Sequence, residues 1–400
     1  MKAIAKNIYY VGVNDRQNRL FESLWPLPYG VSYNSYLITG EKTILIDTVE
    51  ICYSEIFFGK IDKILNGRTI DFLIINHMEP DHSGCIHLLR EKYPNMQIIG
   101  NKLTFGMLAG YYNISDGLYE VKDGDILDTG SHKFKFYTAP MVHWPEVMFT
   151  YDETDSILFS ADAFGTFGTL DGGVIDNEMN TDRYWDEMVR YYSNIVGKYG
   201  NPVQKALQKL SGVDIKMICP THGPVWFEQK DKAIGIYDRL SRYEGLNGVT
   251  LIYGSMYGHT GQMADTIASA LSDGGVRNIV IHNVSTSHSS YILRDIFNYK
   301  GVIIGCPTYS NQIFPEIESL LGRIELREVK NRLFGYFGTF TWAGAAVKRL
   351  AAFGEAMKWE IVGNPVEQKQ NINTEEQCVA LGKAMAKKLA STQPPPLEGE

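Results

Sequence analysis

Four side chains of types that bind metal ions occur within one short segment, namely His77, Glu79, Asp81 and His82. The segment directly follows the apolar run 72–75, and a chain that leaves the end of a strand can direct side chains into a cleft. Alternation along an extended chain places residues 77, 79 and 81 on one side and His82 on the other. We therefore expect this segment to serve two adjacent metal ions.

Three further candidate ligands lie downstream, each just after an apolar run that is typical of a strand. These are His143 after Phe136–Met141, Asp162 after Ile157–Ala161, and His222 after Met217–Pro220. A single histidine in such a position usually has a structural role. Because the pattern of a strand followed by His or Asp occurs at four places, it predicts ligands that converge at the edge of a sheet.

The chemistry of these seven side chains narrows the choice of metal. Four imidazoles and three carboxylates provide three negative charges against the four positive charges of two divalent ions, so one bridging hydroxide would balance the site. Asp162 stands alone between the histidine-rich segments and is the natural bridging carboxylate. A mixed nitrogen and oxygen set without thiolate suits iron, manganese or zinc, and hard carboxylates favour redox-active iron.

A second type of site follows in the C-terminal part of the chain, where a strand, a loop and the start of a helix succeed one another over residues 249–271. Backbone N–H groups and hydroxyls in such a loop can bind a phosphate group. The candidate residues of the loop are Ser255, Met256, Tyr257, Gly258, His259 and Thr260. An ordinary turn capped by Thr260 is the alternative, but the loop resembles the phosphate loop of flavodoxins.

Two later loops follow apolar strands of the same region, and ligands of parallel sheets bind at the carboxyl ends of strands. Tyr309 or Trp342 could stack on a flavin ring, while Thr308 and Asn311 could bind its edge or ribityl chain. The candidate residues of these loops are Pro307, Thr308, Tyr309, Asn311, Thr339, Trp342 and Gly344. The phosphate loop suits a monophosphate and lacks the GxGxxG pattern, which favours FMN over FAD or NAD.

The rhythm of strands and helices predicts two domains in the 400 residues. Mixed short strands and helices up to about residue 240 indicate an α+β sandwich. Strands and helices then alternate as in a parallel α/β sheet. We expect a first domain over residues 1–246, a second over residues 247–392, and a disordered tail over residues 393–400.

Composition excludes several classes of protein. With 38 basic and 46 acidic residues the net charge is −8, which argues against a nucleic-acid partner. The apolar runs are far shorter than a membrane span, so no membrane partner is expected. The start of the chain lacks the apolar core of a secretory signal, and the five cysteines form no CxxC pair. A soluble cytoplasmic protein with reduced thiols is expected.

The complete set of candidate metal ligands resembles that of the flavodiiron proteins, also called A-type flavoproteins. The resemblance implies an α+β metallo-β-lactamase-like αββα sandwich followed by an α/β flavodoxin-like doubly wound parallel sheet. It further implies one iron bound by His77, Glu79 and His143, and a second bound by Asp81, His82 and His222, with Asp162 bridging. Hydrolytic zinc members of the fold carry HxHxDH, whereas Glu79 replaces the middle histidine here.

The same resemblance implies an oxidoreductase that reduces O2 to water, NO to N2O, or both, and so protects against these gases. It implies FMN and two iron ions per chain, rubredoxin or another electron donor, and a head-to-tail homodimer or a tetramer. By resemblance, Tyr191 or Tyr192 and also Tyr29 are expected near the metal site, and the position of Trp144 next to His143 suggests that it walls the same pocket. Some relatives carry histidine in place of Tyr29, so the preference between O2 and NO stays open.

Two alternatives to this reading stay open from the residues alone. One is a zinc-dependent hydrolase of the metallo-β-lactamase fold, fused to a flavodoxin, in which a metal-bound hydroxide is the nucleophile. The other is a non-catalytic electron carrier whose first domain is only a scaffold. Glu79 and the flavodoxin-like half argue against the hydrolase, and the intact set of ligands argues against the carrier.

Overall fold

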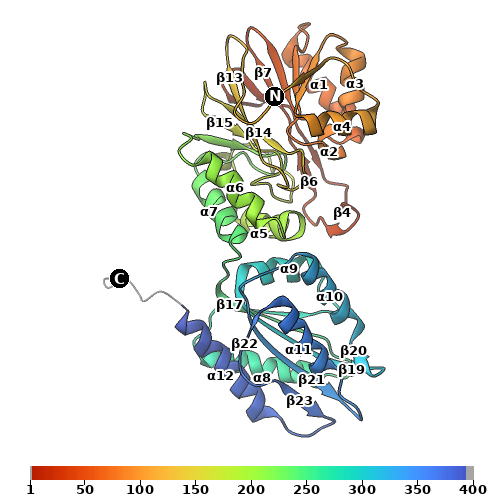
Figure 1. Ribbon diagram of the computed structural model, residues 1–400, viewed down its shortest axis with the longest axis vertical. Helices are drawn as coiled ribbons and strands as arrows, with labels where there is room; N and C mark the ends of the chain where they lie inside the picture. Colours follow the sequence, from red (N-terminus) through yellow and green to blue (C-terminus); the bar gives the residue numbers. More distant parts are fainter. Residues whose placement is uncertain (1, 393–400) are drawn as a thin grey trace, which may run out of the picture. The chain divides into compact units, whose positions relative to one another are not determined.

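The computed structural model describes residues 2–392 and divides after Ser241 into two compact units, which we describe separately (Figure 1). The expected boundary after residue 246 lies within the first strand of the second unit, and the expected tail over 393–400 lies outside the described residues. Within the described residues, no helix is both long and apolar enough to cross a bilayer.

The first unit contains two main sheets. The first sheet has the order β1 (Lys2–Ala5), β2 (Ile8–Tyr10), β7 (Tyr36–Thr39), β8 (Thr43–Ile46), β9 (Phe72–Ile74), β10 (Gln97–Gly100) and β11 (Leu118–Glu120). The second has the order β12 (Ile126–Asp128), β13 (Lys133–Thr138), β14 (Met148–Asp152), β15 (Ile157–Phe159) and β16 (Met217–Cys219). Pairing is antiparallel over the first four strands of each sheet and parallel after them.

The two sheets enclose one apolar core. Alternate residues of β8 in the first sheet and of β13 in the second, such as Ile44, Ile46, Phe134 and Phe136, belong to the same cluster of buried side chains. Because side chains alternate along a strand, the other faces of both sheets need their own cover. Helices provide this cover, so the unit has four layers.

The helices of the first unit lie outside the two sheets (Figure 1). They are η1 (Ile51–Tyr53), α1 (Ser54–Leu65), α2 (Pro80–Ser83), α3 (Ile86–Lys92), α4 (Lys102–Tyr112), η2 (Asp176–Glu178), α5 (Asp182–Tyr191), the π-helical turn η3 (Tyr192–Val196), α6 (Gly200–Leu210) and α7 (Lys230–Ser241). Two small ribbons complete the unit: β3 (Val13–Asp15) pairs with β6 (Val31–Tyr33), and β4 (Leu20–Phe21) pairs with β5 (Trp25–Pro26).

The second unit is built on one mainly parallel sheet. Its order is β18 (Ile279–Asn283), β17 (Leu246–Tyr253), β19 (Tyr299–Tyr309), β21 (Leu333–Phe340) and β22 (Glu360–Ile361), with β20 (Gln312–Ile313) beside β19 and β23 (Val366–Lys369) beside β21. The helices are α8 (His259–Asp273), α9 (Ser289–Asn298), α10 (Pro315–Leu326), α11 (Ala346–Met357) and α12 (Glu375–Ser391). Figure 1 shows these helices on both faces of the sheet, as a doubly wound fold requires.

The expected fold class is confirmed for both units. Sequence patterns were weakest for strands that carry few apolar residues. The strand β21 pairs at its start with β22 and along its second half with β23, whose sequence Val-Glu-Gln-Lys is mostly polar. A strand held mainly by backbone hydrogen bonds at the end of a sheet carries little hydrophobic signal.

Candidate metal centre and flavin pocket

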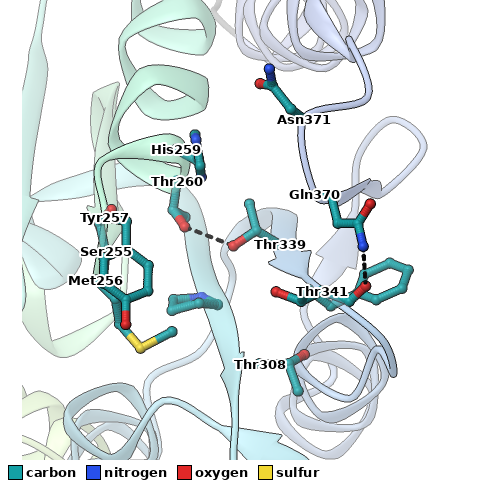
Figure 2. Close-up of a pocket in the computed structure, with 12 residues that line it drawn as sticks. Ser255, Met256, Tyr257, His259, Thr260, Thr308, Thr339, Thr341, Gln370 and Asn371 are labelled. Carbon is teal, nitrogen blue, oxygen red and sulfur yellow. Dashed lines mark hydrogen bonds between the residues drawn. The ribbon is translucent and has the colours of Figure 1, made fainter.

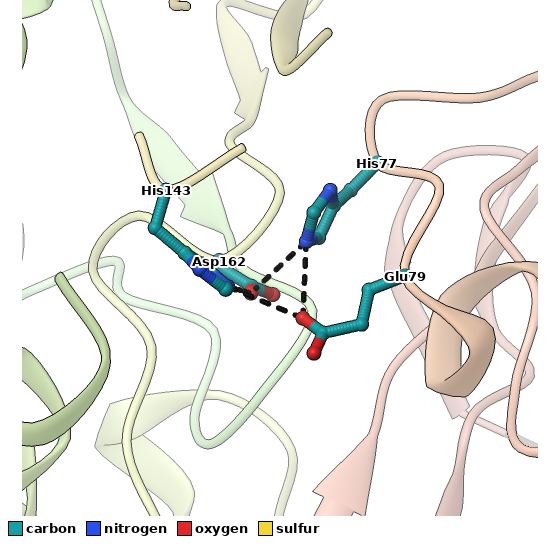
Figure 3. A group of neighbouring side chains, drawn as sticks. All are labelled: His77, Glu79, His143 and Asp162. Atoms are coloured by element: carbon teal, nitrogen blue, oxygen red, sulfur yellow. Dashed lines mark hydrogen bonds and ion pairs between the residues drawn. The ribbon is translucent and has the colours of Figure 1, made fainter. Parts of the chain in front are cut away.

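The seven candidate metal ligands come together in the first unit as two neighbouring groups. In the first group, ligand atoms of His77, Glu79, His143 and Asp162 all lie within 4.8 Å of one another (Figure 3). In the second group, ligand atoms of Asp81, His82 and His222 do so. All seven side chains are largely buried, which is unusual for ionisable groups unless they are paired or bind a cation.

The ligands stand in loops and in the short helical turn α2 at one end of the sandwich. His77 and Glu79 follow β9, and His143 lies between β13 and β14. The alternation expected for residues 77, 79 and 81 is wrong, because Pro80 begins the helical turn α2 and the chain is no longer extended at Asp81. Asp81 therefore joins His82, and the segment divides its four ligands as two pairs.

Asp162 connects the two groups. Its Oδ2 lies 3.0 Å from His143 Nε2 and 3.5 Å from His77 Nε2. Its Oδ1 lies 3.1 Å from His82 Nε2 and 3.6 Å from His222 Nε2. Each oxygen thus faces a different group, and this is the geometry that a carboxylate needs to reach two ions at once.

Hydrogen bonds hold two of the histidines with one nitrogen directed into the centre. His77 Nδ1 lies 2.8 Å from Glu146 Oε1, and His222 Nδ1 lies 2.8 Å from the carbonyl oxygen of Ser32. Because a carbonyl oxygen only accepts, His222 donates through Nδ1 and keeps an unprotonated Nε2. This is the tautomer that binds a metal ion, and such outer partners orient imidazole ligands.

The second group has unsatisfied ligand atoms that fit a cation. Neither carboxylate oxygen of Asp81 has a hydrogen-bond partner, although both are buried. The facing nitrogens of His82 and His222 are 3.0 Å apart. A buried carboxylate beside two imidazole nitrogens is costly without a positive ion. The donor set of nitrogen and oxygen atoms is one that iron, manganese and zinc accept.

The pKa values of the ligand residues also reflect the burial of several ionisable groups in one place. Burial raises the pKa of Asp81 to about 8; His82 opposes this shift, and the charges of Glu79 and Asp162 add to it. Burial also acts on Asp162, but His82 and His77 together hold its pKa well below the usual range. Burial and neighbouring His82 lower the pKa of His222 to about 4, so this ring is neutral at pH 7.

Several polar residues that support the centre were not identified from the sequence. Glu146 is fully buried and also accepts a hydrogen bond from the backbone N–H of Met78, at 2.9 Å. Asp47 Oδ1 accepts from the N–H groups of Asn76 and His77, at 2.7 and 3.3 Å. Thr221 donates to Asp162 Oδ1 at 2.5 Å. Their only sequence signal is that Asp47 and Thr221 also follow strands.

The four residues expected around the metal site differ in position. The Tyr191 ring is buried 5.5 Å from that of His222, and its hydroxyl has no hydrogen-bond partner. The Trp144 ring lies 5.3 Å from His77. Tyr192 is buried one position further along the chain.

Tyr29 is different, because it is 49% exposed and its ring lies against the guanidinium of Arg183 at 5.1 Å. An aromatic residue that the sequence analysis missed lies closer to the ligands. The Phe21 ring, on the ribbon formed by β4 and β5, stands 5.4 Å from the His222 ring. It also contacts Tyr191 at 6.2 Å, so this ribbon contributes an apolar wall to the centre.

The second unit has a cavity of about 320 Å³ at the carboxyl ends of its strands (Figure 2). Eight expected flavin-binding residues line it: Ser255, Met256, Tyr257, His259, Thr260, Pro307, Thr308 and Thr339. Four residues that were not expected also line it: Phe340, Thr341, Gln370 and Asn371. Gln370 and Asn371 follow β23, the strand that the sequence pattern did not reveal.

The loops that line this cavity are joined by hydrogen bonds. The hydroxyl oxygens of Thr260 and Thr339 are 3.0 Å apart, and Gln370 Nε2 donates to the Thr341 carbonyl oxygen at 3.3 Å (Figure 2). Gly258 precedes α8 with a φ of +93°, a conformation that favours glycine. The N–H groups that begin α8 are thereby presented to the cavity, which suits a phosphate group.

The remaining expected flavin residues lie in the same loops without lining the described cavity: Gly258, Tyr309, Asn311, Trp342 and Gly344. Tyr309 and Trp342 are exposed, Trp342 by 76%. Thr308 lines the cavity but also accepts hydrogen bonds from the N–H groups of Ala345 and Ala346, at 3.0 and 3.2 Å. Part of its role is therefore to hold the start of α11.

Fold and site together define a protein with a β-lactamase-like metal domain followed by a flavodoxin domain. The family models "ODP family beta lactamase" and "Flavodoxin" match residues 31–223 and 251–382. A nitric oxide reductase of Moorella thermoacetica is 30% identical over 97% of this chain and 98% of its own.

Solved structures give the same result. The rubredoxin oxygen:oxidoreductase of Desulfovibrio gigas has a TM-score of 0.92 and 29% identity, covering 98% of both chains. The flavodiiron protein of Giardia intestinalis has a TM-score of 0.92 and 27% identity, covering 97% of this chain and 96% of that one. The chain belongs to the flavodiiron protein family.

Replacing the carboxylate that faces both groups tests its role. We expect Asp162→Ala to lose at least one metal ion per chain while it keeps its flavin, because the change removes the ligand oxygens that the two groups share. Metal analysis and flavin absorbance of anaerobically purified protein measure both quantities. Asp176→Ala, at another buried aspartate of the first unit that belongs to no group of possible metal ligands, is the control. An unchanged metal content in Asp162→Ala would disprove the shared role.

Glu146 provides a second test at the edge of the centre. We expect Glu146→Ala to weaken metal binding about 10- to 100-fold, because His77 loses the partner that orients its ring. Titration with Fe²⁺ or Co²⁺ against a competing chelator measures the affinity. Glu153→Ala, at an exposed glutamate on the neighbouring turn, should bind metal normally. Equal affinities of the two variants would show that Glu146 does not support the site.

Proposed function

We propose that this protein is an oxidoreductase that reduces O2 to water, NO to N2O, or both, with one FMN and two iron ions per chain. One observation carries the proposal: two buried nitrogen and oxygen ligand groups share Asp162 in a chain that also holds a flavodoxin domain. Two similar proteins are named for one of these reactions each, the nitric oxide reductase and the rubredoxin oxygen:oxidoreductase.

The metal ligands divide by position in this proposal. One iron would be held by His77, Glu79 and His143, and the other by Asp81, His82 and His222, while Asp162 faces both groups and could serve both ions. When bound, the iron pair would supply two neighbouring one-electron redox centres that can bind and reduce a small gas.

The surrounding side chains act on orientation, water and protons. Glu146 and Ser32 fix His77 and His222 with Nε2 directed inward. Trp144 and Phe21 place apolar rings beside the ligands and so limit the entry of water. We assign proton donation, or a hydrogen bond to the substrate, to Tyr191, because its ring lies 5.5 Å from that of His222, its buried hydroxyl has no hydrogen-bond partner, and both reactions consume protons.

The cavity of the second unit is assigned to FMN. The start of α8, together with Ser255 and Thr260, binds the phosphate, while residues after β19, β21 and β23 surround the rest. FMN supplies a carrier that takes up electrons from a donor and releases them singly. We propose rubredoxin or a similar reduced protein as that donor, which the name of the Desulfovibrio gigas protein supports. Five cysteines without a disulfide support a cytoplasmic location.

We further propose a head-to-tail homodimer in which the flavin of one chain lies beside the metal centre of its partner. Apolar side chains surround the flavin cavity without cover from the rest of the unit. Tyr257 is 86% exposed and Trp342 is 76% exposed, and Met256 and Tyr309 are also exposed. Large exposed rings around a functional pocket are typical of an interaction surface.

The direct test of the proposed reaction is to mix the fully reduced protein with O2 and, separately, with NO. We expect rapid reoxidation of the flavin by at least one gas, because electrons pass from FMN to the metal centre and on to the gas. Stopped-flow absorbance follows the flavin, and metal analysis of the same sample should give about two irons and one FMN per chain. Slow reoxidation by both gases in a sample so loaded would disprove the function.

The dimer has its own test. We expect the double variant Tyr257→Ser and Trp342→Ser to shift from dimer toward monomer, because truncating buried interface aromatics costs more than about 1 kcal/mol each. Sedimentation at several concentrations measures the association. Leu326→Ser, at an exposed position at the end of α10, is the control. A wild-type protein that is monomeric at micromolar concentration would contradict the proposal.

A further inference from the structure

The first unit has an apolar cavity that none of the roles above uses. Its volume is about 470 Å³, and it lies between α6, α7 and the strands β15 and β16. It opens to solvent on one side, where Ser211, Asp231 and Gly235 of its lining are exposed. Most of its lining consists of aliphatic or aromatic side chains, including Leu158, Phe164, Leu210, Ile218 and Ile234. Polar groups line it at Ser211, Asp231 and Asp238, and Asp238 Oδ1 already accepts a hydrogen bond from Gln204 at 2.8 Å.

The floor of the cavity is the outer face of the second sheet. Leu158 and Ile218 are paired in register on β15 and β16, and both are fully buried. Their neighbours Phe159 and Cys219 belong to the core between the two sheets. Because successive side chains point to opposite faces, Leu158 and Ile218 face the helices. The cavity therefore lies under α6 and α7, outside the core between the sheets.

The same two strands lead directly to the metal centre. Asp162 is four residues after Leu158, and His222 is four residues after Ile218. A fully extended chain spans at most about 3.6 Å per residue, so each ligand residue lies within about 14 Å of the cavity floor along its strand. The cavity floor and the ligands are thus parts of one short structural segment.

The wall between the cavity and the ligands consists of aromatic rings. Phe164 lines the cavity, and its ring lies 4.8 Å from that of Tyr237, whose hydroxyl donates to the backbone carbonyl of Asp162 at 3.4 Å. The Tyr237 ring contacts that of Tyr192 at 5.0 Å, and the adjacent Tyr191 contacts His222 at 5.5 Å. The rings of this wall carry no charge at pH 7.

The π-helical turn η3 begins at Tyr192, so this wall also includes the start of an irregular helical segment. Such turns are frequent at functional sites, because they widen a helix locally. Passage of a gas molecule through this wall therefore requires local motion of its buried rings.

We propose that this cavity binds small apolar gases and supplies them to the metal centre through the aromatic wall. The inference rests on the proposed function, because O2 and NO are the apolar diatomic molecules that the centre would consume. The apolar floor of the cavity offers dissolved apolar gases, including xenon, a surface that they prefer to water. Partition into the cavity raises the local concentration of dissolved gas within about 14 Å of the ligands.

Xenon is the probe for the binding step, because it is apolar and needs no redox chemistry. Crystals of the purified, metal-loaded protein are placed under xenon pressure, and anomalous density is sought between α7 and the strands β15 and β16. We expect a xenon atom in contact with Leu158, Phe164 or Ile218. Absence of xenon from the cavity would overturn the proposal, whether or not the protein reduces a gas.

Filling the cavity tests the supply of gas. We expect Ile234→Trp, and independently Leu207→Phe on the opposite helix, to raise KM for O2 or NO about threefold or more with kcat unchanged. Ile236→Trp is the matched control, since Ile236 is also half-buried on α7 but does not line the cavity. Metal and FMN contents are measured for each variant to confirm that it is folded and loaded.

These outcomes distinguish a failure of the proposed gas supply from a failure of the proposed enzymatic function. A raised KM in the cavity variants but not in Ile236→Trp supports supply through the cavity. Xenon in the cavity together with an unchanged KM in both filled variants would overturn the supply role. A wild-type protein that binds xenon but reduces neither gas would contradict the proposed function, and the supply role would fall with it.

Discussion

The first unit is organised around three carboxylates that are buried together with four imidazoles. Burial penalises each negative charge, and Asp81 responds with a raised pKa, whereas Asp162 keeps its charge because His77 and His82 face it. Such a cluster is stable only if positive charge enters it or protons neutralise it. Glu146 and the Ser32 carbonyl accept hydrogen bonds from His77 and His222, and Thr221 donates one to Asp162. These bonds hold the ligands in the arrangement that accepts cations.

Most of these ligands follow the ends of strands, which explains why several of them could be predicted from the sequence. Strands that end at the same edge of a sandwich bring together whatever follows them, so His77, Asp162 and His222 could be located from apolar runs alone. The division of the ligands in residues 77–82 between the two groups was harder to predict from the sequence. Pro80 starts a helical turn that moves Asp81 to the side of His82, and a short turn of this kind has no periodic signal.

Residues outside the ligand set were harder to predict for physical reasons. Glu146 looks like any surface glutamate in the sequence, and only the fold shows that it is buried and paired with His77. Phe21 reaches His222 from a ribbon of two short strands, whose length is too small for a pattern. Gln370 lines the flavin cavity because β23 joins the sheet through its backbone, although its side chains are mostly polar.

The division of the ligands between the two sheets has a mechanical consequence. In each group, at least one ligand follows a strand of the first sheet and at least one follows a strand of the second, as His77 and His143 do in one and His82 and His222 in the other. Each bound ion would thus connect the two sheets of the sandwich. Since an unfolded chain offers no such preformed site, metal loading and resistance to unfolding are thermodynamically linked in this unit.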